Sequence, residues 1–135
     1  MSHEGHELHP TVCAQEVSLA FKVPLLADEL RGRIDAFMSA LTSSLQDDGC
    51  NLIGHIKGLL EVEGNKHLFF SVTSFEEKAS YKGEPPHKIS KAKFTFNVIV
   101  YGVEQQTVER AVREGLITTL WRNIRGNVSF DLELS

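Results

Sequence analysis

The sequence predicts an α+β fold: a two-layer sandwich in which two helices cover one face of a mixed five-stranded sheet. Apolar residues alternate with a period of two in five segments, and they recur at three- and four-residue spacing in two others. These segments follow the order β-α-β-β-β-α-β. Each helix should link two parallel-running strands through a right-handed crossover, which is a split βαβ plan with one additional strand.

The chain of 135 residues fits one domain, which we expect to span residues 13–135. Residues 1–12 are polar, rich in His and Glu, and broken by Gly5 and Pro10, which predicts a flexible lead-in. No apolar run is long enough to span a membrane, and the start of the chain resembles no signal peptide. We therefore expect a cytoplasmic protein.

The first half of the chain predicts one helix and three strands. Clean alternation predicts a strand over residues 17–23 that ends at Pro24. A single apolar stripe then predicts a helix over residues 25–45. Residues 51–62 and 66–75 read as two further strands joined by a short Gly/Asn turn, which is typical of an antiparallel hairpin.

The second half predicts a loop, a strand, a helix and a last strand. Residues 76–88 are polar and contain two prolines, so we expect a protruding loop. Alternation resumes over residues 92–101 and again over residues 128–134. Between them a helix is predicted over residues 104–123, and Gly115 in its apolar stripe suggests a close approach to the sheet.

The sheet face that the helices leave open is more apolar than a solvated face requires. Large exposed apolar patches usually mark an interface. We therefore expect a homo-oligomer, a dimer or higher, formed through this face or through a strand edge, and a protein partner is also compatible with it. The apolar residues expected on the open face are Ile53, Leu59, Phe69, Phe75, Ile99 and Tyr101.

The charge balance argues against nucleic acids as partners. The chain has 14 Lys and Arg against 18 Asp and Glu, which gives a net charge of −4, whereas a duplex-binding protein usually presents a basic face. The same sign argues against an anionic membrane surface. Phe94 and Phe96 faintly imitate the aromatic pattern of RNA-binding strands, but their alternation assigns them to the core face.

Three histidines in the lead-in are candidate metal ligands. His3, His6 and His9 recur every third residue, and imidazole binds zinc, nickel, copper and cobalt well. Cys13 and Cys50 are soft donors, but neither belongs to a CxxC motif. The simpler interpretation is a solvated polar tail and two small buried thiols, with no disulfide in a reducing compartment.

A second group of polar residues is a candidate for acid–base chemistry. His55, Lys57 and Glu61 share one strand face by the period of two, and a hairpin pairing through the Gly64 turn would bring His67 or Phe69 near Leu59 or Glu61. A histidine beside a carboxylate is a reasonable acid–base pair or part of a metal site. The simpler interpretation is a polar stripe with cross-strand charge pairs.

One segment resembles a known family. Gly54-His55-Ile56-Lys57-Gly58, followed by Leu68-Phe69-Phe70-Ser71-Val72-Thr73, is similar to a segment downstream of the nucleotide-binding domain in some CobW-like proteins. Those proteins are P-loop GTPases of the metallochaperone class, associated with cobalamin and metal delivery. The resemblance implies a free-standing accessory module near metal or corrinoid chemistry. It does not imply GTP hydrolysis, because this chain has no Walker motif.

Three functions follow from these patterns. The first is a small accessory or binding domain linked to metal or corrinoid metabolism, with a transition metal as its cofactor if one is bound. The second is a small enzyme that uses His55 and Glu61 as an acid–base pair, aided by Lys57. The third is a single-stranded RNA-binding domain that uses the open sheet. The sequence contains no GxGxxG, GxSxG or HExxH motif, which favours the non-enzymatic functions.

Overall fold

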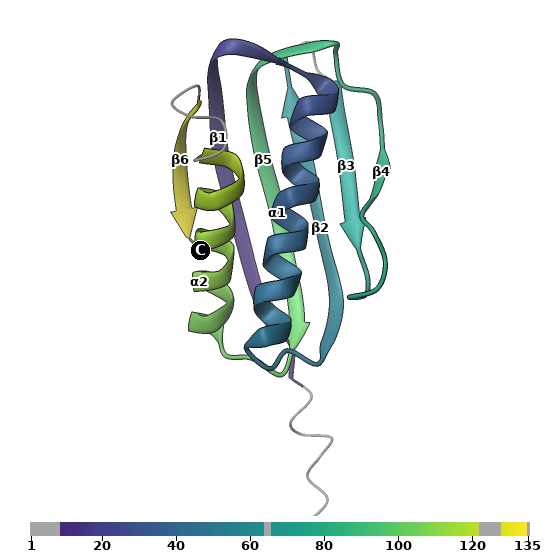
Figure 1. Cartoon of the computed structure of the whole chain (residues 1–135), viewed down its shortest axis with the longest axis vertical. Coiled ribbons are helices and arrows are strands. Elements are labelled where there is room, and N and C mark those ends of the chain that lie inside the picture. Colours follow the sequence, from purple (N-terminus) through teal and green to yellow (C-terminus); the bar gives the residue numbers. More distant parts are fainter. Residues whose placement is uncertain (1–8, 64–65, 122–127, 135) are drawn as a thin grey trace, which may run out of the picture.

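The computed structural model describes residues 9–63, 66–121 and 128–134. Within these residues, two α-helices and a π-helical turn alternate with six strands (Figure 1). In chain order the elements are β1 (Thr11–Leu26), α1 (Ala27–Asp47), β2 (Leu52–Val62), β3 (Lys66–Val72), β4 (Ser80–Lys82), β5 (Lys88–Tyr101), α2 (Gln105–Leu116), the π-helical turn η2 (Ile117–Trp121) and β6 (Val128–Leu134).

The strands form one sheet in the order β4-β3-β2-β5-β1-β6, and both helices lie on one face of it (Figure 1). The predicted two-layer α+β sandwich is confirmed. Strands β1 and β2 run in the same direction, as do β5 and β6, so each helix links parallel-running strands as expected. The sheet is nevertheless antiparallel at every described pairing rather than mixed, because β5 lies between β1 and β2 and β1 lies between β5 and β6.

Four strands differ from the sequence-based expectation. Strand β5 begins at Lys88 rather than at residue 92, and β3 ends at Val72 rather than at residue 75. Strand β4, which pairs with β3, is a sixth strand within the segment expected to be a loop. Strand β1 begins at Thr11, inside the expected lead-in, and continues past Pro24 to Leu26. Its register against β5 shifts between Ala20 and Leu25, and a proline is tolerated at such an irregularity because no ladder hydrogen bond is required of it there.

Helix α1 is amphipathic and begins two residues later than expected. Glu29 accepts a hydrogen bond from the backbone N–H of Leu26 at 3.1 Å, which satisfies a donor at the helix start. The chain turns after the helix at Gly49, whose φ of 101° favours glycine. No described helix, α1 included, is both long and apolar enough to cross a bilayer.

Helix α2 ends earlier than expected and continues as η2, while residues 122 and 123 of the expected helix lie outside the described part of the chain. The hydroxyl of Thr119 donates to the carbonyl of Gly115 at 2.6 Å. A Cβ added at Gly115 would lie 3.2 Å from the ring of Phe37. Gly115 therefore allows a close approach between α2 and α1, not between α2 and the sheet as the sequence suggested.

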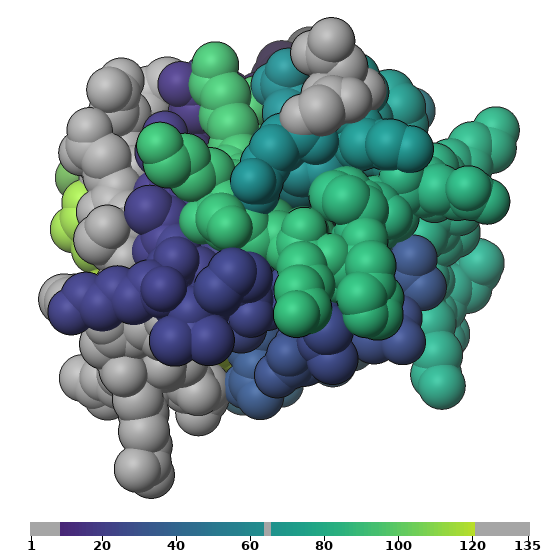
Figure 2. All heavy atoms as spheres, turned by 90° about the horizontal axis from the view of Figure 1, so that it is seen from above, coloured from purple at the N-terminus to yellow at the C-terminus, as the bar shows by residue number. Residues whose placement is uncertain are grey.

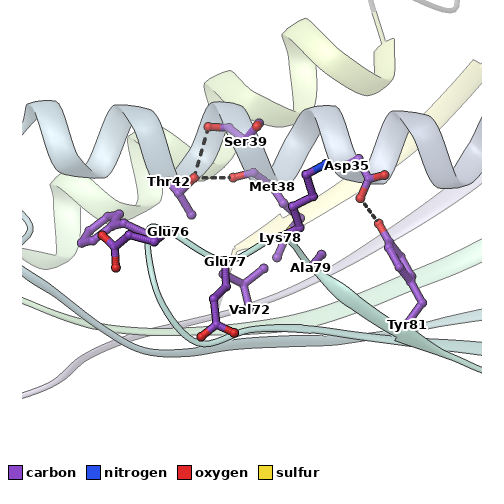
Figure 3. A pocket seen from close by; sticks show the side chains of 11 residues that line it. Asp35, Met38, Ser39, Thr42, Val72, Glu76, Glu77, Lys78, Ala79 and Tyr81 are labelled. Carbon is purple, nitrogen blue, oxygen red and sulfur yellow. Dashed lines mark hydrogen bonds between the residues drawn. The ribbon is translucent and has the colours of Figure 1, made fainter.

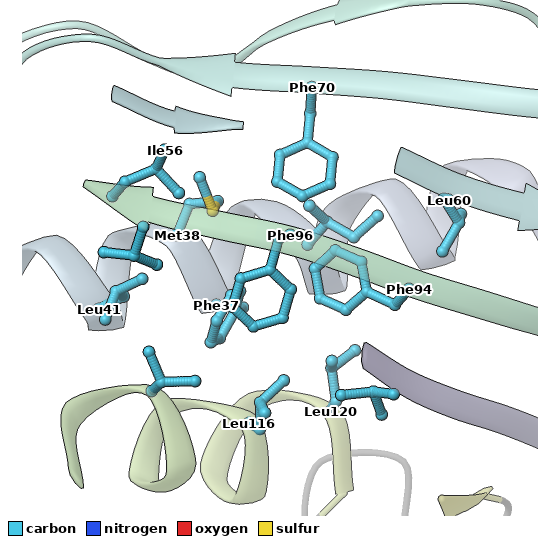
Figure 4. Close-up of a cluster of buried hydrophobic side chains, with 14 of the residues drawn as sticks. Phe37, Met38, Leu41, Ile56, Leu60, Phe70, Phe94, Phe96, Leu116 and Leu120 are labelled. Atoms are coloured by element: carbon cyan, nitrogen blue, oxygen red, sulfur yellow. The ribbon is translucent and has the colours of Figure 1, made fainter. Parts of the chain in front are cut away.

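The core between the layers is centred on phenylalanines (Figure 4). The Phe37 ring of α1 meets the rings of Phe94 and Phe96 of β5 edge-on, at centroid distances of 5.8 Å and 5.2 Å. Phe70 of β3 packs against Phe94 at 5.3 Å. Phe94 and Phe96 thus face the helices, as their alternation indicated, and aromatic pairs of this kind each add about 0.5–1.5 kcal/mol beyond area burial.

An irregularity in β2 changes which residues face the helices. The pairing of β2 with β5 shifts between Ile53 and His55, so two residues of β2 lie where β5 has one step. As a result Ile53 is buried and Leu52 is 52% exposed. The expectation that Ile53 lies on the open face and Leu52 on the core face was wrong, because strict alternation does not survive a bulge.

At one end of the molecule the β1–α1 corner lies against the segment that enters β5 (Figure 2), and hydrogen bonds connect these parts of the chain. The N–H of Ala27 donates to the carbonyl of His87 at 3.0 Å. Glu63, at the end of β2, accepts hydrogen bonds from the N–H groups of Ser90 and Lys91 in β5. These hydrogen bonds lower the pKa of the Glu63 carboxyl below its usual value, because they stabilise its charged form.

Replacement of Gly58 by alanine tests the packing in the core. A Cβ at this position would lie 2.1 Å from Cζ of Phe70, so the ring must move. We expect Gly58→Ala to lower the free energy of unfolding by about 1–3 kcal/mol in urea titrations. The matched control is Gly32→Ala in α1, where a Cβ meets nothing within 4 Å and alanine should stabilise the helix by about 0.5–1 kcal/mol. Equal unfolding midpoints for the two variants would contradict this packing.

Candidate functional site

The three residues proposed for acid–base chemistry lie on the open face of β2. His55 is opposite Ile99 of β5, Lys57 is opposite Asn97, and Glu61 is opposite Lys93. Glu61 lies six positions after His55, which corresponds to about 20 Å along an extended strand. The structure therefore places these side chains on one face but does not bring His55 and Glu61 into contact.

Glu61 instead has a histidine and a lysine as its neighbours across the sheet. His67 of β3 is its direct partner on one side and Lys93 of β5 on the other, which agrees with the proximity that the hairpin predicted. Lys93 in turn forms an ion pair with Glu16 of β1 at 3.6 Å, with both side chains 49% exposed. This row of alternating charge is typical of a solvated sheet face, where such pairs each contribute a few tenths of a kcal/mol.

The apolar residues of the open face differ in part from those that the sequence indicated, since Leu52 and Val12, opposite Tyr101 and Ile99, belong to it. Leu59, Ile99 and Tyr101 lie there and are partly exposed. Phe69 is 52% exposed and lies directly opposite Leu59. Phe75 does not belong to this face, since β3 ends at Val72 and Phe75 packs against the core from the segment that follows.

A hollow of about 420 Å³ surrounds Phe69 on the open face. Lys57 and Lys82 flank the ring, and none of the residues that line the hollow carries a carboxylate. The ring of His67 stacks beside that of Phe69, with centroids 6.4 Å apart and planes 20° apart. The lining residues are Lys57, Gly58, Phe69, Phe70, Ser71, Ser80, Tyr81 and Lys82.

Sequence reasoning did not find the β4 side of this hollow. Ser80 and Lys82 were assigned to a loop, yet β4 places them opposite Ser71 and Phe69 of β3. The hydroxyls of Ser71 and Ser80 lie 3.3 Å apart, within hydrogen-bond distance. The only sequence signal is the polar–aromatic–polar alternation over three residues, which is too short to distinguish a strand from a loop.

The glycines of the Gly54-His55-Ile56-Lys57-Gly58 segment have a packing explanation. A Cβ at Gly54 would lie 3.1 Å from the carbonyl oxygen of Ile99 and 3.3 Å from the ring of Tyr101. Gly58 makes room for the Phe70 ring in the core. Close packing within the sheet therefore favours a glycine at Gly54 and is incompatible with a Cβ at Gly58 unless Phe70 moves, independently of any ligand.

A second cavity, of about 410 Å³, lies behind β4 on the helix side of the sheet (Figure 3). It is bounded by α1 and by the connecting segment, residues 73–79, between β3 and β4. Met38, Val72 and Phe75 form apolar walls, and Glu76 and Glu77 lie on the connecting segment. The hydroxyl of Thr42 donates to the carbonyls of Met38 and Ser39 in its own helix, at 2.9 Å and 3.2 Å.

Tyr81 separates the two cavities and joins β4 to α1. Its hydroxyl donates a hydrogen bond to Asp35 (Figure 3), and the Arg31 guanidinium lies over its ring, 5.4 Å from the centroid. Partial burial raises the pKa of Tyr81 well above its ordinary value, and the hydrogen bond to Asp35 together with the negative charge of that carboxylate raises it further.

The residues considered as metal ligands are not brought together in the described part of the chain. His3 and His6 lie outside the described residues. His9 borders a shallow hollow with Asp48 and Glu104. Across the described ranges, no group of three or more His, Cys, Asp or Glu side chains has an arrangement that could hold a metal ion.

Both cysteines are free and buried, which agrees with their interpretation as small buried residues. The amide nitrogen of Gln15 donates to the sulfur of Cys13 at 3.3 Å. Burial raises the pKa of the Cys13 thiol, and the hydrogen bond from Gln15 only partly opposes this effect. Cys13 is therefore held as a thiol rather than a reactive thiolate.

Comparison with known proteins gives a faint likeness. No protein-family model and no curated protein matches the chain. The Zn(II)-bound YjiA GTPase from E. coli is 15% identical, with a TM-score of 0.40 over 84% of this chain and 31% of that chain. A Zn(II)-bound triple mutant of YjiA is 16% identical, with a TM-score of 0.41 over 80% of this chain and 29% of that chain. The chain spans less than a third of the length of either structure.

The titration of Tyr81 tests its environment. The raised pKa means that Tyr81 contributes constant stability below its ordinary value near pH 10 and loses that contribution as the pH rises further. In a Tyr101→Phe variant Tyr81 is the only tyrosine, so tyrosinate absorbance reports it alone. We expect no ionisation at pH 10 in the folded protein, and a lower pKa when Asp35→Leu is added. A midpoint at pH 10 in the folded Tyr101→Phe protein would contradict the contacts described.

Proposed function

We propose that this chain is an accessory binding domain whose open sheet face binds a nucleotide, either free or as a unit of single-stranded RNA. The observation that carries the proposal is the hollow around Phe69, which combines an exposed aromatic ring with two lysines and two hydroxyls. Its volume of about 420 Å³ lies within the range of ligand pockets, about 300–1,000 Å³.

The aromatic ring supplies a stacking platform for a base. Phe69 is 52% exposed in the folded chain, so its ring is accessible from the open face. A base that stacks on such a ring gains about 1–3 kcal/mol, largely independently of its identity. The neighbouring His67 ring, whose plane is nearly parallel to that of Phe69, provides a second ring surface along β3.

The lysines supply the charge for a phosphate. Lys82 is directly opposite Phe69 on β4, and Lys57 is its diagonal neighbour on β2. Glu61 lies opposite His67, two residues along the strands from the pair Leu59–Phe69, and does not border the hollow. The hollow is thus locally cationic although the chain as a whole has a net charge of −4. A local patch of this kind suits one nucleotide or a few, not a long duplex.

Titrations with adenosine monophosphate, adenosine and a short oligoadenylate test the proposal. We expect adenosine monophosphate to bind more tightly than adenosine, and Phe69→Ala to weaken binding by about 5- to 150-fold. The matched control is Leu52→Ala, which removes an equally exposed apolar side chain from β2 outside the hollow and should leave the affinity unchanged. Tighter binding of the oligoadenylate identifies RNA as the source of the nucleotide.

The salt dependence of oligoadenylate binding separates the roles of the two lysines. Each lysine that contacts a phosphate should contribute about 0.7 to the slope of log affinity against log salt, so Lys57→Gln and Lys82→Gln should each reduce that slope. Failure of the wild-type protein to bind any of the three ligands at low salt would refute the proposed function.

Self-association is the competing use of the same surface, and we propose a homodimer through it as the alternative. Phe69 and Leu59 form an apolar pair that a second copy could cover. Sedimentation of the wild-type chain and of Phe69→Ala decides between the two. A dimer that Phe69→Ala dissociates, together with no nucleotide binding, assigns the face to a second copy of the chain.

A metal-linked accessory role is a second proposal, supported by the CobW-like segment and by the histidines of the lead-in. Native mass spectrometry with elemental analysis of untagged protein tests it. A transition metal at a fixed ratio to the chain, lost when residues 1–10 are removed, would support this role. No metal bound to the full chain at micromolar concentration would exclude it.

A further inference from the structure

Strand β4 presents its side chains to opposite sides of the sheet. Its pairing with β3 involves three residues: Ser80 opposite Ser71, Tyr81 opposite Phe70, and Lys82 opposite Phe69. Side chains alternate along a strand, so Ser80 and Lys82 face the open side with Phe69, while Tyr81 faces the helices with the buried Phe70. All three residues border the hollow, but only Ser80 and Lys82 direct their side chains to the open face, while the side chain of Tyr81 lies on the helix side.

Tyr81 is held from two positions on α1. Its hydroxyl donates to Asp35, and Arg31 covers its ring at 5.4 Å. Arg31 and Asp35 are four residues apart, so they lie on the same side of the helix, one turn from each other. Figure 3 shows the tyrosine rising from β4 to meet the Asp35 carboxylate across the layer boundary. Helix α1 is a rigid element of the core, which makes it a firm anchor.

Without this contact, β4 has few other attachments. Three residues make a short edge strand, and among the described residues the hydroxyl pair of Ser71 and Ser80 is the side-chain hydrogen bond between β4 and β3. The cavity of about 410 Å³ lies between the preceding segment and α1, and Glu76, Glu77 and Lys78 in that segment are exposed. Gly83, with a φ of 110°, packs against the carbonyl of His67 at the other end of the strand.

We propose that Tyr81 is a positioning residue for the nucleotide site: its contact with Asp35 and Arg31 holds β4 so that Ser80 and Lys82 face the ligand beside Phe69. This inference rests on the proposed function for the identity of the ligand. The hold on β4 is a property of the chain itself and has a readout that needs no ligand.

A double-mutant cycle tests whether Tyr81 acts through Lys82. We expect Tyr81→Phe, which removes only the hydroxyl, to weaken binding of adenosine monophosphate by about three- to tenfold. If Tyr81 acts by positioning Lys82, the pair Tyr81→Phe and Lys82→Gln should lose no more affinity than Lys82→Gln alone. The control cycle pairs Tyr81→Phe with Lys57→Gln on β2, where the two effects should add.

Two replacements of Asp35 test the hydrogen bond directly. Asp35→Asn keeps an oxygen that accepts from Tyr81, and we expect its affinity to stay within about twofold of wild type. Asp35→Leu removes the acceptor and should match Tyr81→Phe. Urea unfolding of both variants is measured as well. Similar free energies of unfolding show that the difference in affinity does not come from a general loss of stability.

Hydrogen exchange of the β4 amides gives the ligand-independent readout. We expect Tyr81→Phe to accelerate exchange at residues 80–82 by about three- to tenfold and to leave the central amides of β5 unchanged. Unchanged exchange in β4, or faster exchange with unchanged affinity, overturns the positioning role. If the wild-type chain binds no nucleotide, the proposed function fails. In that case, faster exchange of the β4 amides in Tyr81→Phe still supports the view that Tyr81 holds β4 in place, and unchanged exchange refutes it.

Discussion

The pairing of β5 with both β1 and β2 is the constraint on which the rest of the structure depends. This strand of 14 residues lies at the centre of the sheet and separates the two strands that α1 connects. Its inward side chains include Phe94 and Phe96, which meet Phe37 of α1 and set the position of that helix. Its outward side chains, such as Lys93 and Asn97, form the middle of the open face.

The open face owes its composition to local departures from regular strand geometry. The irregularity at Gly54 moves Ile53 into the core and Leu52 onto the open face that carries Lys57. Gly58 lets the Phe70 ring fill the core, so β3 packs closely against β2 and presents Phe69 outward. The candidate ligand site is thus a consequence of how the core is packed beneath it.

The short strand β4 links the two layers at the edge of the sheet. Two of its residues complete the hollow on the open face, and Tyr81 between them reaches α1 on the other side. The period-two geometry of a strand makes this division unavoidable, since neighbouring side chains must point in opposite directions. The contact of Tyr81 with α1 and the hollow around Phe69 therefore share the same three-residue strand.

The sequence by itself determined the two-layer α+β sandwich, the placement of both helices on one face and the inward direction of Phe94 and Phe96. These features follow from hydrophobic periodicity, which is local and can be read along the chain. Gly115 was recognised as a point of close approach, but only the structure identified α1 rather than the sheet as its neighbour.

The tertiary structure alone decided the insertion of β5 between β1 and β2, the existence of β4 and the pairing of Glu61 with Lys93. Strand order depends on which edges pair across long stretches of chain, and periodicity does not encode this. The position of Lys82 beside Phe69 could not be predicted for the same reason. It depends on the pairing of three β4 residues with β3, and so short a strand has no recognisable sequence pattern. Local pattern decides which way a side chain faces, and long-range pairing decides what it faces.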